Sequence, residues 1–347
     1  MRYKNVYLDA IGYHLPDTVI STKEIEERIQ PVYESLRVPK GQLEFLTGIK
    51  ERRWWPENFQ VSDGATVAAE NALRSTPYSR EDVDILIYAG VCRDYYEPAT
   101  ACRVAHKLGL KDQAMVYDLS NACLGVLNGI IEIANRIELG QVDVGMVVSC
   151  ESAREINEDT IQKMLANRNI DFFKETLATL TGGSGAVAIV LSSEAKGQGL
   201  GHRLIGGANR SDTRHHELCR WGVRRLPEKV LEQFLMTDAV NVMKYGVQLG
   251  INTWQALLAE LKWAHEAIDK TISHQVSKGH RSSILKALGL PEAIDFPTFD
   301  RLGNMGTVSL PLTAAIAAEQ NFLVKGDRVG FLGIGSGLNC LMLGVEW

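Results

Sequence analysis

Cys123 is the residue whose surroundings in the sequence most favour chemistry. An apolar run over 114–119 ends at the polar residues Ser120 and Asn121, and a stretch with helical apolar periodicity follows Cys123. This pattern predicts a strand-to-helix turn, with Cys123 in the first turn of a buried helix. Because a helix N-terminus carries a partial positive charge that stabilises a thiolate, we interpret Cys123 as a nucleophile. The alternative is a thiol that only packs, which is the commoner fate of a free cysteine.

Three later segments could supply partners for this nucleophile. His274 ends a short apolar run, at the strand edge where α/β proteins build ligand sites. Asn304 is flanked by glycines, which let the backbone turn sharply and approach a ligand. The Gly-Ser-Gly turn around Ser336 offers backbone N–H groups that can hold an oxyanion. From the residues alone, a packed histidine and an Asx-turn stay open as structural alternatives.

The composition excludes several classes of protein. The chain has 347 residues, 45% of them hydrophobic and 23% charged, which is ordinary for a globular protein with two domains or a duplicated one. A net charge of -5 gives no basic surface for nucleic acid. No apolar run reaches the ~18 residues of a transmembrane segment. The six cysteines have neither disulfide-framework nor metal-ligand spacing, so we expect a cytoplasmic protein without a metal site.

Apolar, β-branched runs alternate with helical patterns along the chain, which predicts an α/β fold with buried, largely parallel strands. The candidate strands are Val83–Cys92, Met115–Leu119, Val142–Ser149, Ala186–Leu191, Thr271–Val276 and Arg328–Ile334. The candidate helices are Asp63–Leu73, Ala99–Leu108, Leu124–Leu139, Leu231–Leu249, Thr253–Ala264, His280–Leu288 and Pro311–Gln320.

A Gly-Ser-Gly sequence occurs at 183–185 and again at 335–337, each time before an apolar run. This repeat favours a duplicated core with halves 1–195 and 196–347, joined by a linker over 193–202. The charged, helical stretch 154–181 is interpreted as an insertion in the first half. The stretch 203–228 lacks periodicity, which favours a solvated loop, with a basic rim for an anionic cofactor as the alternative.

Four ordered motifs resemble the thiolase superfamily, in particular its ketoacyl synthase III branch. They are Asn121-Ala-Cys123, His274-Gln275, Gly303-Asn304 and the terminal Gly333-Ile-Gly-Ser336-Gly. Further segments, 21–28, 92–100, 273–277 and 332–340, resemble the OleA-type long-chain acyl-CoA condensing enzymes. The similarity runs nearly end to end. It implies a thiolase fold, a duplicated five-layer αβαβα architecture with two mixed sheets.

The resemblance also implies a role for each site residue. Cys123 would be acylated by an acyl-CoA, with the backbone N–H groups of Cys123 and Ser336 as the oxyanion hole. His274 and Asn304 would donate hydrogen bonds to the thioester oxygen of a second acyl-CoA. Glu97, 26 residues before Cys123, would remove the α-proton of that second donor from the neighbouring subunit of a homodimer. The alternative for Glu97 is a surface carboxylate without a catalytic role.

The sequence departs from ordinary ketoacyl synthase III enzymes where those bind coenzyme A. Their tryptophan and arginine have no counterpart in 45–52, and Lys278 and Arg281 are the nearest basic residues after the His-Gln motif. Malonyl-carrier chemistry is therefore disfavoured.

We expect non-decarboxylative Claisen condensation of two fatty acyl-CoAs, as in hydrocarbon biosynthesis. The product is a β-keto acid or β-ketoacyl thioester, and no cofactor is permanently bound. The alternatives are a decarboxylative 3-oxoacyl-ACP synthase III-type enzyme using a malonyl donor, an acyltransferase of secondary metabolism, and a non-catalytic partner of a related enzyme.

Overall fold

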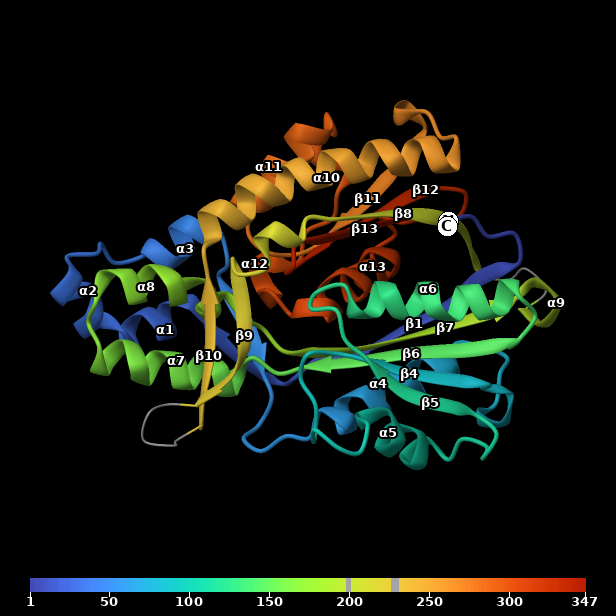
Figure 1. Cartoon of the computed structure of the whole chain (residues 1–347), viewed down its shortest axis with the longest axis horizontal. Helices are drawn as coiled ribbons and strands as arrows, with labels where there is room; N and C mark the ends of the chain where they lie inside the picture. The colour runs from blue at the N-terminus through green and yellow to red at the C-terminus, as the bar shows by residue number, and fades with distance from the viewer. Residues whose placement is uncertain (198–200, 226–230) are drawn as a thin grey trace.

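The computed structural model describes residues 1–197, 201–225 and 231–347. Its helices and strands form five layers, in which two groups of strands alternate with three groups of helices (Figure 1). This confirms the expected α/β fold with five alternating layers.

The first group of strands comes from the N-terminal part of the chain. It contains β1 (Val6–His14), β4 (Ile85–Ala89), β5 (Met115–Leu119), β6 (Val144–Glu151) and β7 (Gly185–Ser193). Their order is β1-β7-β6-β4-β5, with β4 parallel to β5 and β6, and β7 antiparallel to β1 and β6. All residues of β4, β6 and β7 are buried, as expected of strands that helices cover on both faces. The outer helices are α4 (Val61–Arg74) and α5 (Thr100–Leu108).

The second group comes from the C-terminal part. It contains β8 (His202–Ser211), β11 (Lys270–Ser273), β12 (Arg328–Gly335) and β13 (Asn339–Glu346), in the order β11-β12-β13-β8. Its outer face is covered by α10 (Ala239–Leu261) and α11 (Lys278–Leu288) (Figure 1).

A short pairing of β1 with β8 joins the two groups. Tyr7 pairs with Arg203 and Leu8 with His202, so the strands form one nine-stranded sheet. The layers follow the expected architecture, but the two expected sheets are joined into one by this pairing of β1 with β8, which we call the seam.

The central layer consists of α6 (Gly125–Glu138) and α13 (Ser309–Glu319), which lie between the strand groups (Figure 1). Every residue of α13 from Ser309 to Ala317 is buried. Helix α6 lies close to β6, because a Cβ added at Gly129 would come within 2.7 Å of Val147 Cγ1. The N-terminal end of α6, next to Cys123, is therefore held inside the molecule.

The two Gly-Ser-Gly sequences occupy similar places. Residues 183–185 lead into β7, which is antiparallel to β6, and residues 335–337 form the turn before β13, which is antiparallel to β12. The division at 195 and 196 stays a prediction. Within the expected linker, α9 (Glu194–Gly197) follows β7 directly, and 198–200 lie outside the described residues.

Short helices form a separate helical region at one end of the layers (Figure 1). They are α1 (Thr22–Arg28), α2 (Gln30–Leu36), α3 (Gln42–Thr47), α7 (Arg154–Ala166) and α8 (Ile170–Thr176). They share a hydrophobic cluster in which Tyr33 packs edge-on against Phe173. The stretch predicted as an insertion thus forms α7, α8 and a 3-10 turn over Leu177–Thr181. Beside them, β2 (Thr18–Ser21) pairs with β3 (Glu51–Trp54).

Two local predictions after residue 200 are wrong. The expected loop 203–228 contains β8 and β9 (Cys219–Arg225), with 226–228 outside the described residues. The expected helix 231–249 begins as β10 (Leu231–Thr237), the antiparallel partner of β9, and α10 starts only at Ala239. The hairpin depends on pairing with β9 and packing on α7 and α8, which local periodicity does not encode. Across the described ranges, no helix has the length and apolar character needed to span a bilayer.

Candidate active site

Cys123 lies in the turn between β5 and α6. The helix begins at Gly125 with Leu124 as its N-cap, so Cys123 precedes the first helical turn instead of lying in it. The turn is sharp because Ala122 adopts a left-handed conformation with φ 46°, and the N–H of Leu124 donates to the carbonyl of Asn121 over 2.9 Å.

Asparagine side chains fix this turn from two sides. Asn121 Nδ2 donates to Asn128 Oδ1 of α6 over 2.8 Å, and its Oδ1 accepts from Asn339 Nδ2 over 3.2 Å. Asn339 Nδ2 also lies 3.3 Å from the carbonyl oxygen of Ser336. The nucleophile turn is therefore tied to the Gly-Ser-Gly turn between β12 and β13.

Gly335 allows the two turns to touch. A Cβ at this position would lie 3.4 Å from the backbone nitrogen of Cys123 and 3.3 Å from Leu124 Cγ, so a side chain would crowd the nucleophile. The role of the Cys123 and Ser336 N–H groups as oxyanion donors stays a prediction, and this close approach is what that role requires.

His274 follows β11 directly and is bound to the same strand that supports Cys123. Its backbone N–H donates to the carbonyl of Leu332 over 3.0 Å, three residues before Gly335 on β12. The residue is only 5% exposed. Burial, with a smaller effect of the neighbouring His280, lowers the pKa of His274 to about 3, so the ring is neutral at pH 7.

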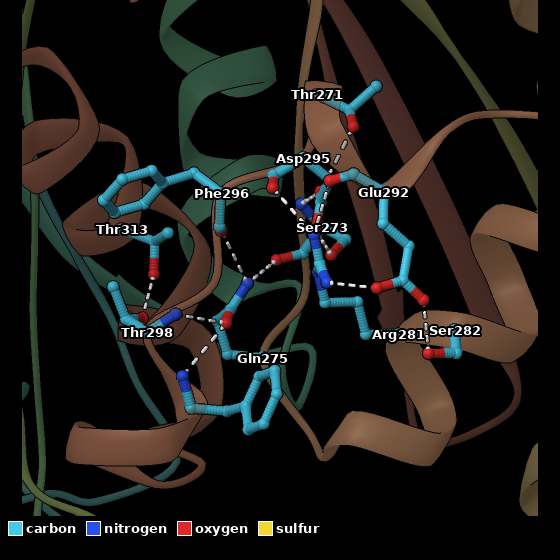
Figure 2. Close-up of polar contacts among 11 residues, drawn as sticks. Thr271, Ser273, Gln275, Arg281, Ser282, Glu292, Asp295, Phe296, Thr298 and Thr313 are labelled. Carbon is cyan, nitrogen blue, oxygen red and sulfur yellow. Dashed lines mark hydrogen bonds and ion pairs between the residues drawn. The ribbon is translucent and has the colours of Figure 1, made fainter. Parts of the chain in front are cut away.

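Gln275 connects the histidine to the loop that carries Asn304. Its Oε1 accepts from the N–H groups of Thr298 and Phe299 over 2.8 and 3.1 Å, at the start of α12 (Phe299–Leu302) (Figure 2). Its Nε2 donates to the carbonyl of Ser273 over 2.7 Å. The sequence singles out the His-Gln pair but not this positioning role of the glutamine.

Asn304 is held in place by its own backbone. Its N–H donates to Thr181 O and its carbonyl accepts from Gly183 N, both over 2.9 Å. The preceding Gly303 has φ 66°, and a Cβ there would come within 2.5 Å of Thr181 O. Only glycine fits this position.

The side chain of Asn304 forms an Asx-turn, the structural alternative given above. Its Oδ1 accepts from the N–H of Gly306 over 3.0 Å. This contact uses the oxygen and orients the amide, and Nδ2 makes no hydrogen bond to the described residues. The turn is thus compatible with a donor role for Nδ2.

Thr307 brings this loop against the nucleophile helix. Its Oγ1 accepts from the N–H of Val126 over 2.7 Å, in the first turn of α6. The loops that carry Cys123, His274 and Asn304 therefore meet around the N-terminal end of α6 and the C-terminal end of β12.

Glu151, at the end of β6, is a site residue that the sequence reasoning missed. It is 4% exposed, and its carboxylate accepts from the N–H groups of Val91 and Cys92 over 2.9 and 3.0 Å. Gly306 packs against it, since a Cβ there would lie 3.5 Å from Glu151 Cγ. Burial raises the pKa of Glu151. An acidic residue at the end of a predominantly apolar run was the available signal.

The protonation of Cys123 differs from the expectation. Burial raises the pKa of the Cys123 thiol to about 12, with further increases from Cys219 and Glu151. A helix end contributes about 0.3–1 kcal/mol at a surface, which is small beside the cost of burying a charge. The residue is therefore a thiol at neutral pH, and its use as a nucleophile requires a proton acceptor.

Glu97 lies outside this cluster. It is exposed in the loop between β4 and α5, next to Tyr95 and Tyr96, which are 57% and 90% exposed. Its carboxylate has no ion-pair partner among the described residues. Its contribution across a dimer interface stays a prediction.

The two basic residues expected to bind coenzyme A, Lys278 and Arg281, have different surroundings in the structure. Lys278 lines a surface cavity of about 590 Å³ together with Phe45 and Lys50. Arg281 does not: its Nε lies 2.7 Å from Asp295 Oδ2 and its Nη1 3.0 Å from Glu292 Oε2 (Figure 2). Its side chain is only 13% exposed, so these ion pairs give Arg281 a structural role, and its place among the coenzyme A ligands stays a prediction.

Family models match both halves of the chain. Residues 47–193 match the thiolase N-terminal domain, and residues 258–347 match the 3-oxoacyl-[acyl-carrier-protein] synthase III C-terminal domain. An acyl-CoA:acyl-CoA alkyltransferase from Shewanella oneidensis is 51% identical over the full length of both chains. An enzyme of the same name from Xanthomonas campestris is 36% identical, also over the full length of both.

Solved structures agree with these matches. A crystal structure of OleA from Xanthomonas campestris covers 100% of this chain and 98% of its own, with a TM-score of 0.94 at 36% identity. Other structures of that protein carry substitutions of a glutamate or a histidine, and one contains lauric acid and lauroyl-CoA. Its substituted glutamate precedes its substituted cysteine by 26 positions, as Glu97 precedes Cys123. The chain belongs to the OleA-type acyl-CoA:acyl-CoA alkyltransferases, condensing acyltransferases of the thiolase superfamily.

Proposed function

We propose that this enzyme condenses two fatty acyl-CoA molecules through an acyl thioester on Cys123, without loss of CO₂. The observation that carries the proposal is the meeting of three loops, bearing Cys123, His274 and Asn304, around the start of α6. The name of the relatives, acyl-CoA:acyl-CoA alkyltransferase, supports acyl-CoA as both donor and acceptor.

In the first step Cys123 takes an acyl group from the first acyl-CoA. Its sulfur attacks the thioester carbonyl, and the thiol proton passes to the sulfur of the departing coenzyme A. The backbone N–H groups of Cys123 and Ser336 stabilise the oxyanion of the tetrahedral intermediate. The intermediate collapses with release of the coenzyme A thiolate, which takes up a proton.

In the second step a second acyl-CoA is converted into a carbon nucleophile. His274 and Asn304 Nδ2 donate hydrogen bonds to its thioester oxygen, which lowers the barrier to removing the α-proton. Glu97 accepts that proton. The carbanion attacks the acyl group on Cys123, so a carbon–carbon bond forms and the carbon–sulfur bond to Cys123 breaks. The departing thiolate takes up the proton that Glu97 removed, which restores the resting thiol.

Glu97 acts from the neighbouring subunit of a homodimer. Tyr95 and Tyr96 beside it are exposed aromatic residues, a type enriched at protein interfaces. The equal spacing to the cysteine in OleA supports the same assignment.

Coenzyme A enters along the cavity that contains Lys278. Lys50 and Lys278 offer ammonium groups for its phosphates, and Phe45, 83% exposed at the rim, offers an aromatic face for its adenine. Lys278 follows His274 by four residues, so this cavity opens close to the catalytic loops. The solved complex of OleA with lauroyl-CoA supports such a ligand.

The product is a β-ketoacyl thioester or, after hydrolysis, a β-keto acid, and the pathway is hydrocarbon biosynthesis. We place the enzyme in the cytoplasm, since its six cysteines are free thiols. A malonyl-dependent reaction is the weaker candidate, because relatives named beta-ketoacyl-[acyl-carrier-protein] synthase III, such as that of Natranaerobius thermophilus, are 27% identical.

Glu97→Gln tests the proposal, because it removes the base and keeps the size of the side chain. Acylation of Cys123 by a labelled acyl-CoA should persist in this variant, while condensation should fall by about 10²-fold or more. Glu81→Gln, at another exposed carboxylate of the same half, is the matched control and should leave both steps unchanged. Full condensation activity in Glu97→Gln would remove Glu97 as the base.

A further inference from the structure

A second histidine lies beside His274 in a cavity that the reaction described above does not use. His280 is in the first turn of α11, where the side chain of Ser277 caps the helix by accepting from the N–H of His280 over 3.2 Å. Both histidines line one small internal cavity, together with apolar side chains that include Ile284, Leu332 and Met342. His274 is 5% exposed and His280 7% exposed.

Within the described ranges, the two rings present the only fully buried polar side-chain atoms of this cavity that lack a hydrogen bond. Nδ1 of His274 and Nδ1 of His280 are both buried without a hydrogen-bond partner among those residues. The other polar side chains of the lining are engaged. Ser273 Oγ donates to Asp295 Oδ2 over 3.1 Å, and Cys340 Sγ donates to Gly333 O over 3.2 Å.

The size of the cavity matches one water molecule. It offers about 10 Å³, the lower end of the volume that a buried water requires. Buried waters are found where otherwise unpaired polar groups surround them, and the two unpaired ring nitrogens supply such groups.

The protonation of the rings determines how such a water would be bound. Burial lowers the pKa of His280 to about 4 and that of His274 to about 3, so both rings are neutral at pH 7. A neutral imidazole has one N–H donor and one acceptor nitrogen. A water between two neutral rings can therefore accept from one Nδ1 and donate to the other.

We propose that His280 is a positioning residue, which fixes the tautomer of His274 through one buried water. Nδ1–H of His280 donates to the water, and the water donates to Nδ1 of His274. Nε2 of His274 then carries the hydrogen. This arrangement rests on the proposed function, in which His274 donates to a thioester oxygen, and it explains how a buried histidine is kept in the donor form.

The tautomer can be measured without any substrate. Protein labelled with ¹⁵N at histidine is compared by NMR with His274→Asn, which assigns the signals of His274. We expect Nε2 to be protonated and Nδ1 to be the acceptor nitrogen in the unmodified enzyme. A hydrogen on Nδ1 of His274 would overturn the proposal, whatever reaction the enzyme performs.

Variants of His280 test the water-mediated contact. His280→Leu removes the donor, whereas His280→Asn keeps an N–H close to the position of Nδ1. We expect His280→Leu to populate the other tautomer of His274 and to lower kcat for condensation at least tenfold, with KM unchanged. His280→Asn should restore most of both. Ile284→Val, one turn further along α11 in the same cavity, is the packing control and should change neither.

The outcomes separate this proposal from the proposed function. Equal loss in His280→Asn and His280→Leu would overturn the water-mediated contact and assign His280 a packing role. An unchanged tautomer in His280→Leu would also overturn it. If the tautomer shifts as expected while no acyl group appears on Cys123 of the unmodified enzyme, the proposed function fails and the positioning of His274 stands.

Discussion

At Cys123, burial and the helix end act on the thiol in opposite directions. Burial raises its pKa to about 12, and the nearby carboxylate of Glu151 adds to the effect. The resting enzyme therefore holds a thiol that is a poor target for electrophiles, and a base must take its proton when substrate is bound.

The pH dependence of alkylation checks this directly. Because the thiolate fraction of Cys123 grows tenfold per pH unit below its pKa, alkylation by iodoacetamide should rise about tenfold per unit from pH 7 to pH 10. Peptide mass spectrometry follows the modification of Cys123 alone, with Cys123→Ser as the blank. A plateau near pH 8 would contradict the raised pKa.

Asn304 offers a second test at the scale of single residues. Asn304→Asp replaces the Nδ2 donor with an oxygen that repels the charge developing on the thioester. Condensation should fall by about 10²–10³-fold, the usual effect of losing one such donor, while acylation of Cys123 persists. Quench-flow with labelled acyl-CoA measures the two steps separately, and equal losses in both would contradict a role of Asn304 that is specific to the second step.

At this scale the sequence predicted which loops meet but not the electrostatics of the residues on them. Cys123, His274 and Asn304 are recognisable because their flanking glycines and polar corners are local. The raised pKa of Cys123 depends on burial by distant segments, and Glu151 acts through Val91 and Gly306, far from it in the chain. Neither is visible in a local pattern.

At the scale of elements, β12 is the common support of the site. Leu332 binds His274 and Gly335 touches the turn of Cys123, so both depend on the position of this strand. The adjacent β11 is held by Asp295, which accepts from Thr271 and Ser273 and pairs with Arg281 of α11 (Figure 2).

Arg281→Met tests the structural role assigned to that arginine. It leaves the carboxylate of Asp295 buried without its partner, which typically costs about 3–5 kcal/mol in the free energy of unfolding. Burial already raises the pKa of Asp295, and Arg281 lowers it, so the variant should raise it further. Because the folded state then binds the proton more tightly than the unfolded state, the loss of stability should be constant above the raised pKa and shrink as the pH falls through it towards the unfolded-state pKa of about 3.9.

Urea unfolding at several pH values measures this effect. Lys278→Met on the same helix is the control and should change stability little, since Lys278 makes no ion pair with the described residues. A loss in Arg281→Met that does not depend on pH would contradict the account of Asp295.

The helices and strands were predictable where one apolar helix face or one apolar run determines them. Strands β4 to β6 and helices α4 to α6 follow apolar runs and periodicities that the sequence displays. The hairpin of β9 and β10 was not predictable from the sequence. Residues 231–237 have a pattern compatible with a helix, and they become a strand because they pair with β9. The seam between β1 and β8 likewise rests on two residue pairs that no motif marks.

At the scale of the whole molecule, the account requires two chains for one site. Mixed dimers test this requirement, because a chain with Cys123→Ala and a chain with Glu97→Gln are each inactive alone. In a mixed dimer, the intact Cys123 of one chain meets the intact Glu97 of the other. Random mixing should therefore restore about a quarter of the activity of the unmodified enzyme, since half of the dimers are mixed and each has one complete site.

Activity that stays at background after the two chains have exchanged would contradict a base supplied across the interface. Exchange itself can be followed by native mass spectrometry with one chain isotopically labelled, so a negative result is not confused with dimers that failed to mix.

The central claim is that Cys123 carries an acyl group to a second acyl-CoA and that no carbon is lost. The most direct measurement incubates the enzyme with one fully ¹³C-labelled acyl-CoA and no malonyl donor. Mass spectrometry then records both the adduct on Cys123 and the released product. We predict an acyl adduct on Cys123 and a β-keto product that contains all carbons of two acyl groups, with neither in Cys123→Ala. Labelled CO₂ formed directly from the thioester substrate, or a product that appears only when malonyl-CoA is added, would contradict the account.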